Sequence, residues 1–269
     1  MEEIKHGNLI VEKSGEIAIV KINRPKKYNA LSFSLLQDLK NLNEDLRTDL
    51  RTRVVILTGE GKAFCAGIDV SKEGREQWYQ NPQPNERLYQ RNGQEIMRGL
   101  GNLDQITIAA VNGLCIGAGV CIATNCDFRI VSEKAYFSIP ETALGFIYSL
   151  SCSYSLLALV GPSNTKRMIL ACDKVSSQEA LAMGLADKVV PQEQLMDAAM
   201  EMAGKIISKA PTANRINKKM INAASVERMY NWCLCEAELV AGAQANAREL
   251  EEGLQAFWEK RQPNFPREI

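Results

Sequence analysis

Short apolar runs that alternate with helical stretches constrain the fold of this chain more than any other feature of its sequence. Val54 to Thr58, Thr107 to Val111 and Phe128 to Val131 are such runs, and the segments between them have the spacing of amphipathic helices. Runs of this length are typical of buried strands. Strands that alternate with helices form crossover units on a parallel sheet, so the sequence predicts an α/β fold.

The N-terminal part predicts a hairpin followed by a helix. Leu9 to Val11 and Ile17 to Ile22 flank the turn residues Ser14-Gly15, and His6 precedes the first expected strand. Ser32 is the expected N-cap of an amphipathic helix. Its buried face would carry Leu35, Leu36, Leu39, Leu42 and Leu46.

Two later segments have different patterns. Glu73 to Asn92 is polar, with aromatic residues and prolines among charges, and predicts a mobile insertion whose loops could line a substrate channel. After Val190-Pro191 the pattern is helical to the end. We place the boundary of this helical region near residue 195.

Length and charge exclude several classes of protein. The 269 residues can bury a sizeable core. Thirty-two basic and thirty-two acidic residues give zero net charge, so there is no overall field to attract nucleic acid or an acidic membrane. The first residues lack the apolar core of a signal peptide, and no apolar run is long enough to span a membrane. We expect a soluble cytoplasmic protein.

Cysteines and histidine limit the available chemistry. The eight cysteines include no CxxC pair and mostly have apolar neighbours, so we expect reduced thiols that fill the core. His6 is the only histidine, which excludes a multi-histidine metal site and makes a catalytic triad implausible. We expect no metal and no redox cofactor.

Two turns could hold a negatively charged oxygen. Cys115 to Gly119 is a small-residue turn between an apolar strand and a helix, and Lys62 to Val70 also places Ala-Gly before an expected helix start. Glycine lets a ligand approach the backbone, and amides in the first turn of a helix are unpaired. Two such amides could clasp one oxyanion. The alternative is two ordinary tight turns.

Glu141 is the strongest side-chain candidate for acid/base catalysis. It follows Pro140 and has Phe137, Ile139 and Leu144 as apolar neighbours. Burial among them would raise the pKa of the carboxyl toward the range of a useful acid/base. The alternative is a surface glutamate.

Six motifs in order resemble the crotonase superfamily, the enoyl-CoA hydratases and isomerases. A single G-x-G turn is a weak signal, but the six cover about nine-tenths of the chain. They are Asn23-Arg24-Pro25, Asn29-Ala30-Leu31, Ala63-Phe64-Cys65-Ala66-Gly67-Ile68-Asp69, Ala109-Ala110-Val111-Asn112-Gly113, Cys126-Asp127 and Pro140-Glu141 with Leu144-Gly145.

The resemblance implies a fold and an assembly. Residues 1–195 would form a crotonase-like spiral of β-β-α turns that carries the acyl-CoA site. Residues 196–269 would form a helical region that packs subunits into a homotrimer, or into a hexamer made of two trimers.

The resemblance also assigns roles to individual residues. The oxyanion amides would be those of Ile68 and Ala118, and Glu141 would shuttle the proton. Other positions would contact coenzyme A: Lys26 and Lys62 near the phosphates, Ala66 near the adenine, and Phe257 and Lys260 across a subunit boundary. Lysines at such positions can equally be solvated surface charges.

Two departures from the family pattern bear on the reaction. Cys121 stands where a two-glutamate hydratase carries its other carboxylate, and Ser149 replaces a glycine of the hydratase turn. Cys121 could be an apolar filler or a thiol acid/base, and a serine without a base is no nucleophile.

The resemblance implies an acyl-CoA enzyme of fatty acid metabolism that stabilises a thioester enolate and needs no cofactor beyond its coenzyme A substrate. Because one carboxylate suits proton shuttling between carbons, double-bond isomerisation is favoured over hydration. A non-catalytic binding subunit is the third alternative.

Overall fold

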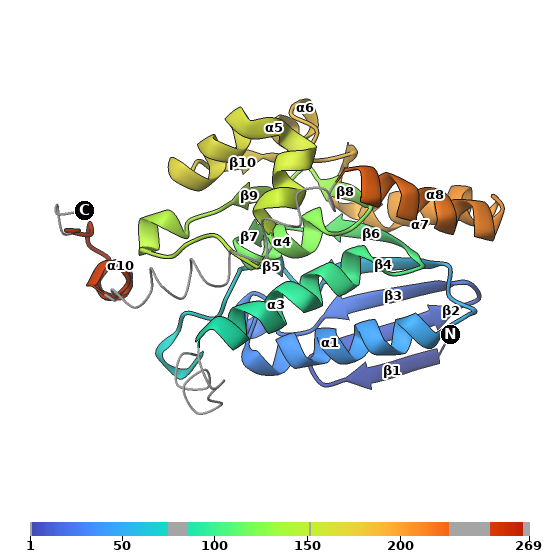
Figure 1. Cartoon of the computed structure of the whole chain (residues 1–269), viewed down its shortest axis with the longest axis horizontal. Helices are drawn as coiled ribbons and strands as arrows, with labels where there is room; N and C mark the ends of the chain where they lie inside the picture. Colours follow the sequence, from blue (N-terminus) through green and yellow to red (C-terminus); the bar gives the residue numbers. More distant parts are fainter. Residues whose placement is uncertain (1, 75–85, 151, 226–247, 266–269) are drawn as a thin grey trace.

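The computed structural model of the protein describes residues 2–74, 86–150, 152–225 and 248–265. Figure 1 shows two β-sheets with helices packed around them. The larger sheet has seven strands in the order β1-β2-β3-β4-β6-β8-β11, and the smaller has four in the order β10-β9-β7-β5.

The larger sheet begins with antiparallel strands and continues with parallel ones. β1 pairs with β2 and β2 with β3 in antiparallel register, whereas the pairings from β3 through β4, β6 and β8 to β11 are parallel. The expected hairpin and the three expected apolar strands are therefore confirmed. The strands are β1 (Glu2–His6), β2 (Leu9–Ser14), β3 (Ile17–Ile22), β4 (Val54–Gly59), β6 (Ile106–Val111), β8 (Phe128–Ser132) and β11 (Lys188–Val190).

The smaller sheet consists of short strands, three of which follow directly on strands of the larger sheet. They are β5 (Ala63–Cys65), β7 (Leu114–Ile116), β9 (Tyr136–Ser138) and β10 (Val175–Ser176). β5, β7 and β9 pair in parallel. A long strand, a short strand and then a helix repeat along the chain, which confirms the expected spiral of β-β-α turns.

The helices cover both faces of the larger sheet and continue to the C-terminal part. Ser32 Oγ accepts a hydrogen bond from the Leu35 amide at 3.2 Å, so it caps α1 as expected. The α-helices in the described ranges are α1 (Phe33–Thr48), α3 (Glu86–Gly101), α4 (Ala118–Thr124), α5 (Cys152–Leu170), α6 (Ser177–Ala182), α7 (Leu195–Ile207), α8 (Pro211–Ala224) and α10 (Arg248–Glu259), and the 3-10 turns there are η1 (Pro25–Lys27), η2 (Thr142–Leu144) and η3 (Gln192–Gln194).

The core lies on both faces of the larger sheet. On one face the leucines of α1 pack with α3, α4 and the smaller sheet, and on the other face α7 covers β4, β6 and β8. α4 is buried along its whole length between the sheets. Helix α4 is therefore enclosed by strands of both sheets and by helices α3 and α5.

Two expectations about the N-terminal half were wrong. The first strand begins at Glu2, so His6 lies within β1 rather than before it. The C-terminal part of the expected insertion, residues 86–92, belongs to α3, where Gln90 is buried. α3 is held there because its later residues Ile96, Met97 and Leu100 pack in the core. Residues 75–85 of that insertion lie outside the described ranges.

The C-terminal region is helical where the structure describes it. α7 packs on the core sheet, while α8 exposes Ile216, Met220 and Ile221. The division at residue 195 and the role of this region in assembly remain predictions. No helix in the described ranges is long and apolar enough to cross a membrane.

Candidate functional site

The two predicted oxyanion turns lie next to each other. β5 and β7 are parallel neighbours, so the turns that follow them emerge at the same edge of the smaller sheet. A methyl group built on Gly67 would lie 3.7 Å from the Ala118 amide nitrogen and 3.1 Å from the Ile116 carbonyl oxygen. Gly67 also has a φ of 87°, which favours glycine. Both the space and the backbone angle therefore require glycine here.

The backbone amide of Ile68 points away from Leu31, the residue with which the Ile68 segment pairs. The Leu31 amide donates to the Gly67 carbonyl at 2.7 Å, and the Asp69 amide donates to the Leu31 carbonyl at 3.0 Å. In an extended segment successive amides point to opposite sides, so the amide between these two bonds points away from Leu31. Within the described chain it donates to no backbone carbonyl.

The amide of Ala118 is the first of α4. Gly117 is the N-cap, with a φ of 50°, and its own amide donates to the Ser138 carbonyl at 2.9 Å. Amides of the first turn have no partner within the helix. Among the described residues the Ala118 amide donates to no backbone carbonyl, so it is free to bind an anionic oxygen beside the Ile68 turn.

Glu141 reaches the N-terminal end of α4 from the neighbouring strand. β9 pairs in parallel with β7, and Glu141 follows β9 after Ile139 and Pro140. A methyl group built on Gly117 would fall 2.2 Å from Glu141 Oε1. The carboxylate therefore lies against the residue that precedes the Ala118 amide.

The environment of Glu141 raises its pKa. Oε2 is buried and has no hydrogen-bond partner among the described residues. Burial removes water from the ionised form and raises the pKa of Glu141 to about 7, whereas its backbone hydrogen bond acts in the opposite direction. Such a carboxyl exchanges protons readily near neutral pH.

Together these groups can stabilise an enolate and move a proton beside it. Two unpaired amides offer positive partial charge to an oxygen that becomes negative. A carboxyl with a pKa near 7 can take a proton from an adjacent carbon and return it.

Comparisons with known proteins give the family. The family model described as enoyl-CoA hydratase/isomerase matches residues 12–268. The chain belongs to the enoyl-CoA hydratase/isomerase family. It is 36% identical over 255 residues to the short-chain-enoyl-CoA hydratase of Clostridium acetobutylicum, covering 94% of this chain and 95% of that protein.

Solved structures of this family include both kinds of enzyme. An enoyl-CoA hydratase from Mycobacterium avium subsp. paratuberculosis superposes with a TM-score of 0.86 at 26% identity, covering 97% of this chain and 100% of that one. A monofunctional enoyl CoA isomerase from M. smegmatis superposes with a TM-score of 0.68 at 30% identity, covering 81% of this chain and 93% of that one.

Three of the five residues that the family resemblance assigns to coenzyme A lie on neighbouring turns. Lys26 and Lys62 are both exposed. A methyl group built on Gly61 would lie 3.2 Å from Pro25 Cβ, which brings the turn before Lys62 beside the turn that holds Lys26. The Ala66 amide donates to the Tyr28 carbonyl at 3.0 Å. All three candidates therefore border one surface.

This surface is fixed by a buried polar network that the sequence motifs did not explain. Asn29 Nδ2 donates to the Ala63 carbonyl at 2.7 Å, and Asn29 Oδ1 accepts from the Arg24 amide at 2.9 Å. Arg24 also pairs with Asp69 at 3.2 Å. The Asn-Arg-Pro and Asn-Ala-Leu motifs therefore join the turn of Lys26 to the segment that carries Ile68.

Phe257 and Lys260 lie at the C-terminal end of α10 and are exposed. Their contact with coenzyme A across a subunit boundary remains a prediction. Trp258, between them, is partly buried, and its Nε1 donates to the Val70 carbonyl at 3.2 Å.

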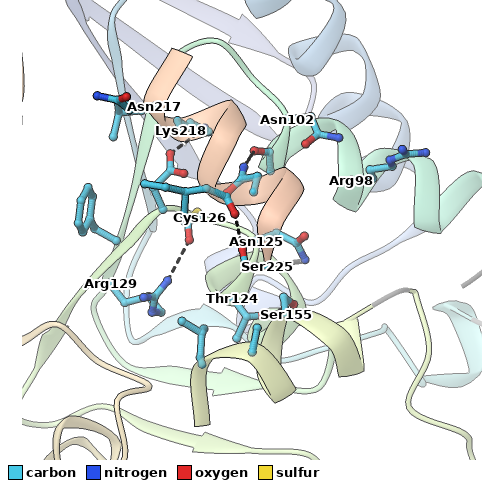
Figure 2. Close-up of a pocket in the computed structure, with 18 of the residues that line it drawn as sticks. Arg98, Asn102, Thr124, Asn125, Cys126, Arg129, Ser155, Asn217, Lys218 and Ser225 are labelled. Carbon is cyan, nitrogen blue, oxygen red and sulfur yellow. Dashed lines mark hydrogen bonds and ion pairs between the residues drawn. The ribbon is translucent and has the colours of Figure 1, made fainter. Parts of the chain in front are cut away.

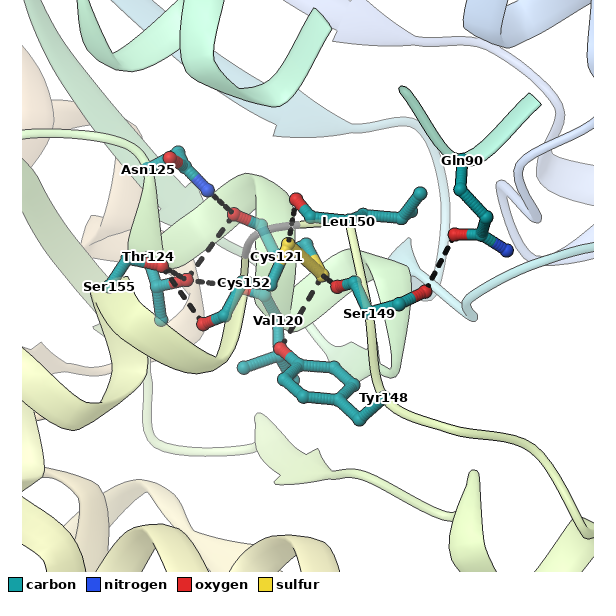
Figure 3. The surroundings of a disulfide bond; sticks show 10 residues. All are labelled: Gln90, Val120, Cys121, Thr124, Asn125, Tyr148, Ser149, Leu150, Cys152 and Ser155. Atoms are coloured by element: carbon teal, nitrogen blue, oxygen red, sulfur yellow. Dashed lines mark hydrogen bonds between the residues drawn. A yellow bond between two sulfur atoms is a disulfide. The ribbon is translucent and has the colours of Figure 1, made fainter. Parts of the chain in front are cut away.

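The expectation that all cysteines are reduced core fillers was wrong for two of them. Cys121 and Cys152 form a disulfide, with their Cα atoms 4.9 Å apart (Figure 3). Cys121 lies in α4 and Cys152 begins α5, and these helices pack together. Helix packing, which local sequence does not reveal, brings the two thiols into bonding distance.

Other side chains pack around this disulfide, at the position where two-glutamate hydratases of the resembled family carry their second carboxylate. The buried Tyr148 hydroxyl lies 3.4 Å from Cys121 Sγ. Figure 3 shows the two side chains in contact. Ser149 Oγ donates to Gln90 Oε1 at 2.9 Å, which links the loop after Glu141 to α3. Sequence reasoning singled out Cys121 and Ser149 but missed Tyr148 and Gln90.

A cavity of about 520 Å³ lies at the other end of α4, between α3, α5 and α8 (Figure 2). Its buried cations are already paired: Lys218 Nζ with Asp127 at 2.7 Å, and Arg129 Nη1 with the Cys126 carbonyl at 2.9 Å. None of the predicted site residues lines it, so we do not assign the family's chemistry to this cavity.

Proposed function

We propose that the protein moves the double bond of an enoyl-CoA thioester, with Glu141 as the single proton carrier. The observation that carries the proposal is the position of the buried Glu141 carboxyl against Gly117, one residue before the Ala118 amide. This geometry supports proton transfer beside a stabilised enolate.

The proposed reaction follows from these groups. The Ile68 and Ala118 amides bind the thioester oxygen of a 3-enoyl-CoA, which acidifies the C2 proton. Glu141 removes that proton, and the negative charge spreads into a dienolate held by both amides. Glu141 then returns the proton at C4, which leaves the 2-enoyl isomer. Each amide can contribute ~3 kcal/mol to stabilising the charged intermediate.

The absence of a second carboxylate at position 121 favours isomerisation over hydration. A hydratase of the resembled type holds its water between two carboxylates. Here Cys121 takes the second position, and its sulfur is bonded to Cys152 and so carries no ionisable proton. A thiol acid/base at Cys121 is therefore disfavoured as well.

Coenzyme A is the proposed carrier of the substrate. Lys26 and Lys62 would meet its phosphates, and Ala66 would lie near the adenine. The charge of the nucleotide would be met by these local lysines, because the chain has no net charge. We propose no metal, nicotinamide or flavin for this reaction.

Hydration is the second candidate, and the relatives favour it. The Clostridium acetobutylicum relative is named a hydratase, as is the Mycobacterium avium structure. Water addition to a 2-enoyl-CoA would use the same two amides and Glu141. A non-catalytic subunit is the third reading, and the raised pKa of Glu141 argues against it.

One screen distinguishes these candidates. The purified protein is incubated with 2-enoyl-, 3-enoyl- and cyclic enoyl-CoA thioesters, and products are resolved by chromatography and mass. Isomerisation changes retention without changing mass, whereas hydration adds the mass of water. Efficient hydration with negligible isomerisation would refute the proposed reaction, and absence of any turnover would favour the binding subunit.

A further inference from the structure

Helix α10 contacts both the turn that follows Glu141 and the segment that follows Ile68. Its first turns pack against η2, the turn that follows Glu141, and its last turn reaches the segment that follows Ile68. A helix rises about 1.5 Å per residue, so the rigid span from Glu249 to Trp258 is roughly 14 Å. One rigid element therefore connects the acid/base to an oxyanion donor.

The contact of α10 with η2 is made backbone to backbone. A methyl group built on Gly145 would fall 2.4 Å from the Glu249 carbonyl oxygen, and one built on Gly253 would fall 2.4 Å from the Leu144 carbonyl oxygen. Glycine is needed on both sides for this approach. Leu254 and Ala256, on the same helix, are fully buried and anchor it.

The contacted turn also holds the backbone of Glu141. The amides of Leu144 and Phe146 donate to the Glu141 carbonyl at 3.0 and 2.8 Å. A displacement of Leu144 would therefore be transmitted to Glu141 through these bonds.

The other end of α10 holds the Ile68 segment. Trp258 Nε1 donates to the Val70 carbonyl at 3.2 Å, two residues after Ile68. Lys72 Nζ lies 5.8 Å from the centroid of the Trp258 ring, a cation–π contact that adds to this attachment.

From these contacts we infer that Gly253 and Trp258 are positioning residues, which set the separation of the Glu141 carboxyl from the Ile68 amide through α10. The inference rests on the proposed role of Glu141 as proton carrier. Misplacement of a catalytic group by about 1 Å can cost as much as 10²-fold in rate, so this separation controls turnover.

The test compares two variants with a matched control. Gly253→Ala adds a methyl group against Leu144, and Trp258→Phe keeps an aromatic ring but removes the N–H that binds Val70. Gly204→Ala is the control, because Gly204 is a helical glycine in α7 whose added methyl would meet nothing within 4 Å.

We expect both variants to lower kcat for 3-enoyl-CoA isomerisation by ~10-fold or more, with KM within about twofold of the unaltered protein. The pH midpoint of kcat/KM should also fall, because a displaced Glu141 gains access to water. Gly204→Ala should leave both unchanged.

Unchanged kcat and pH midpoint in folded Trp258→Phe would overturn the inference, as would a loss confined to KM. If Gly253→Ala fails to fold, Trp258→Phe decides alone. A protein without turnover refutes the proposed function instead. In that case the titration midpoint of Glu141 is measured from stability. The unfolding free energies of the unaltered protein and of each variant are compared, from pH 4 to 8, with those of the same protein carrying Glu141→Gln in addition. A midpoint that does not shift in the variants still refutes the positioning role.

Discussion

Glu141 Oε1 occupies the space where any side chain at position 117 would begin, since a methyl group on Gly117 would lie 2.2 Å from that oxygen. The glycine that starts α4 thus makes room for the proposed proton carrier beside the Ala118 amide. The proposed acid and the proposed oxyanion donor are brought together because their strands, β9 and β7, are parallel neighbours.

Gly117→Ala should therefore lower turnover by ~10²-fold, because the added methyl displaces the Glu141 carboxylate. Gly15→Ala is the matched control. Gly15 also has a positive φ, of 60°, but its added methyl would meet nothing within 4 Å. Steady-state kinetics of both variants measure the effect. Turnover of Gly117→Ala as high as that of Gly15→Ala would contradict the predicted displacement of Glu141 by the added methyl.

Glu141→Gln should lower kcat by ~10²-fold or more and leave thioester affinity nearly unchanged, because the amide keeps the shape but cannot accept the C2 proton. Kinetics together with calorimetric titration of a non-reacting acyl-CoA separate the two effects. Cys121→Ala serves as the comparison and should cost much less. The reverse order would indicate chemistry at the cysteine.

Burial of Glu141 predicts a dependence of stability on pH. Its pKa is raised from 4.5 to about 7, so the folded state binds the proton more tightly than the unfolded state does. The stabilisation is complete below pH 4.5 and is lost as the pH rises to about 7. Relative to Glu141→Gln, the protein should lose about 3 kcal/mol of unfolding free energy across that window.

Denaturant unfolding of both forms at several pH values measures this difference. The same ionisation should make kcat/KM fall about tenfold per unit as the pH drops below 7, since only the carboxylate can take the proton. A difference in unfolding free energy that does not vary with pH would contradict the buried location of the carboxyl.

A second carboxylate should convert the site toward hydration. The double variant Cys121→Glu with Cys152→Ala removes the disulfide and restores an acid at the position where the resembled hydratases carry one. We expect a product with the added mass of water from a 2-enoyl-CoA, measured by mass spectrometry. Cys152→Ala alone is the control and should give none. Equal hydration by both would show that the disulfide, rather than the missing acid, limits the reaction.

The helical region after residue 195 should assemble the protein into trimers or hexamers. Ile216, Met220 and Ile221 of α8 are exposed apolar residues that an assembly could cover. Sedimentation of the purified protein measures the mass of the assembly. A stable and fully active monomer would contradict this prediction and the proposed cross-subunit role of Phe257 and Lys260.

Local sequence determined several elements and pointed to Glu141, and the family resemblance supplied most of the other candidate residues. The spacing of the leucines from Leu35 to Leu46 gave α1 its buried face, and the apolar runs gave β4, β6 and β8, because periodicity is a local property. Glu141 was identified from its own apolar neighbours. The order of six motifs along the chain is sufficient to indicate the family, which the family match over residues 12–268 confirms.

Only the tertiary structure decided which of these residues meet. Gly117 touches Glu141, and Gly253 touches Leu144, because separate elements pack side by side. A disulfide joins Cys121 to Cys152, 31 residues later in the chain. Their apolar neighbours in the sequence predicted two reduced core thiols instead. Such contacts arise from the packing of whole helices and strands, and no residue's immediate neighbours encode that packing.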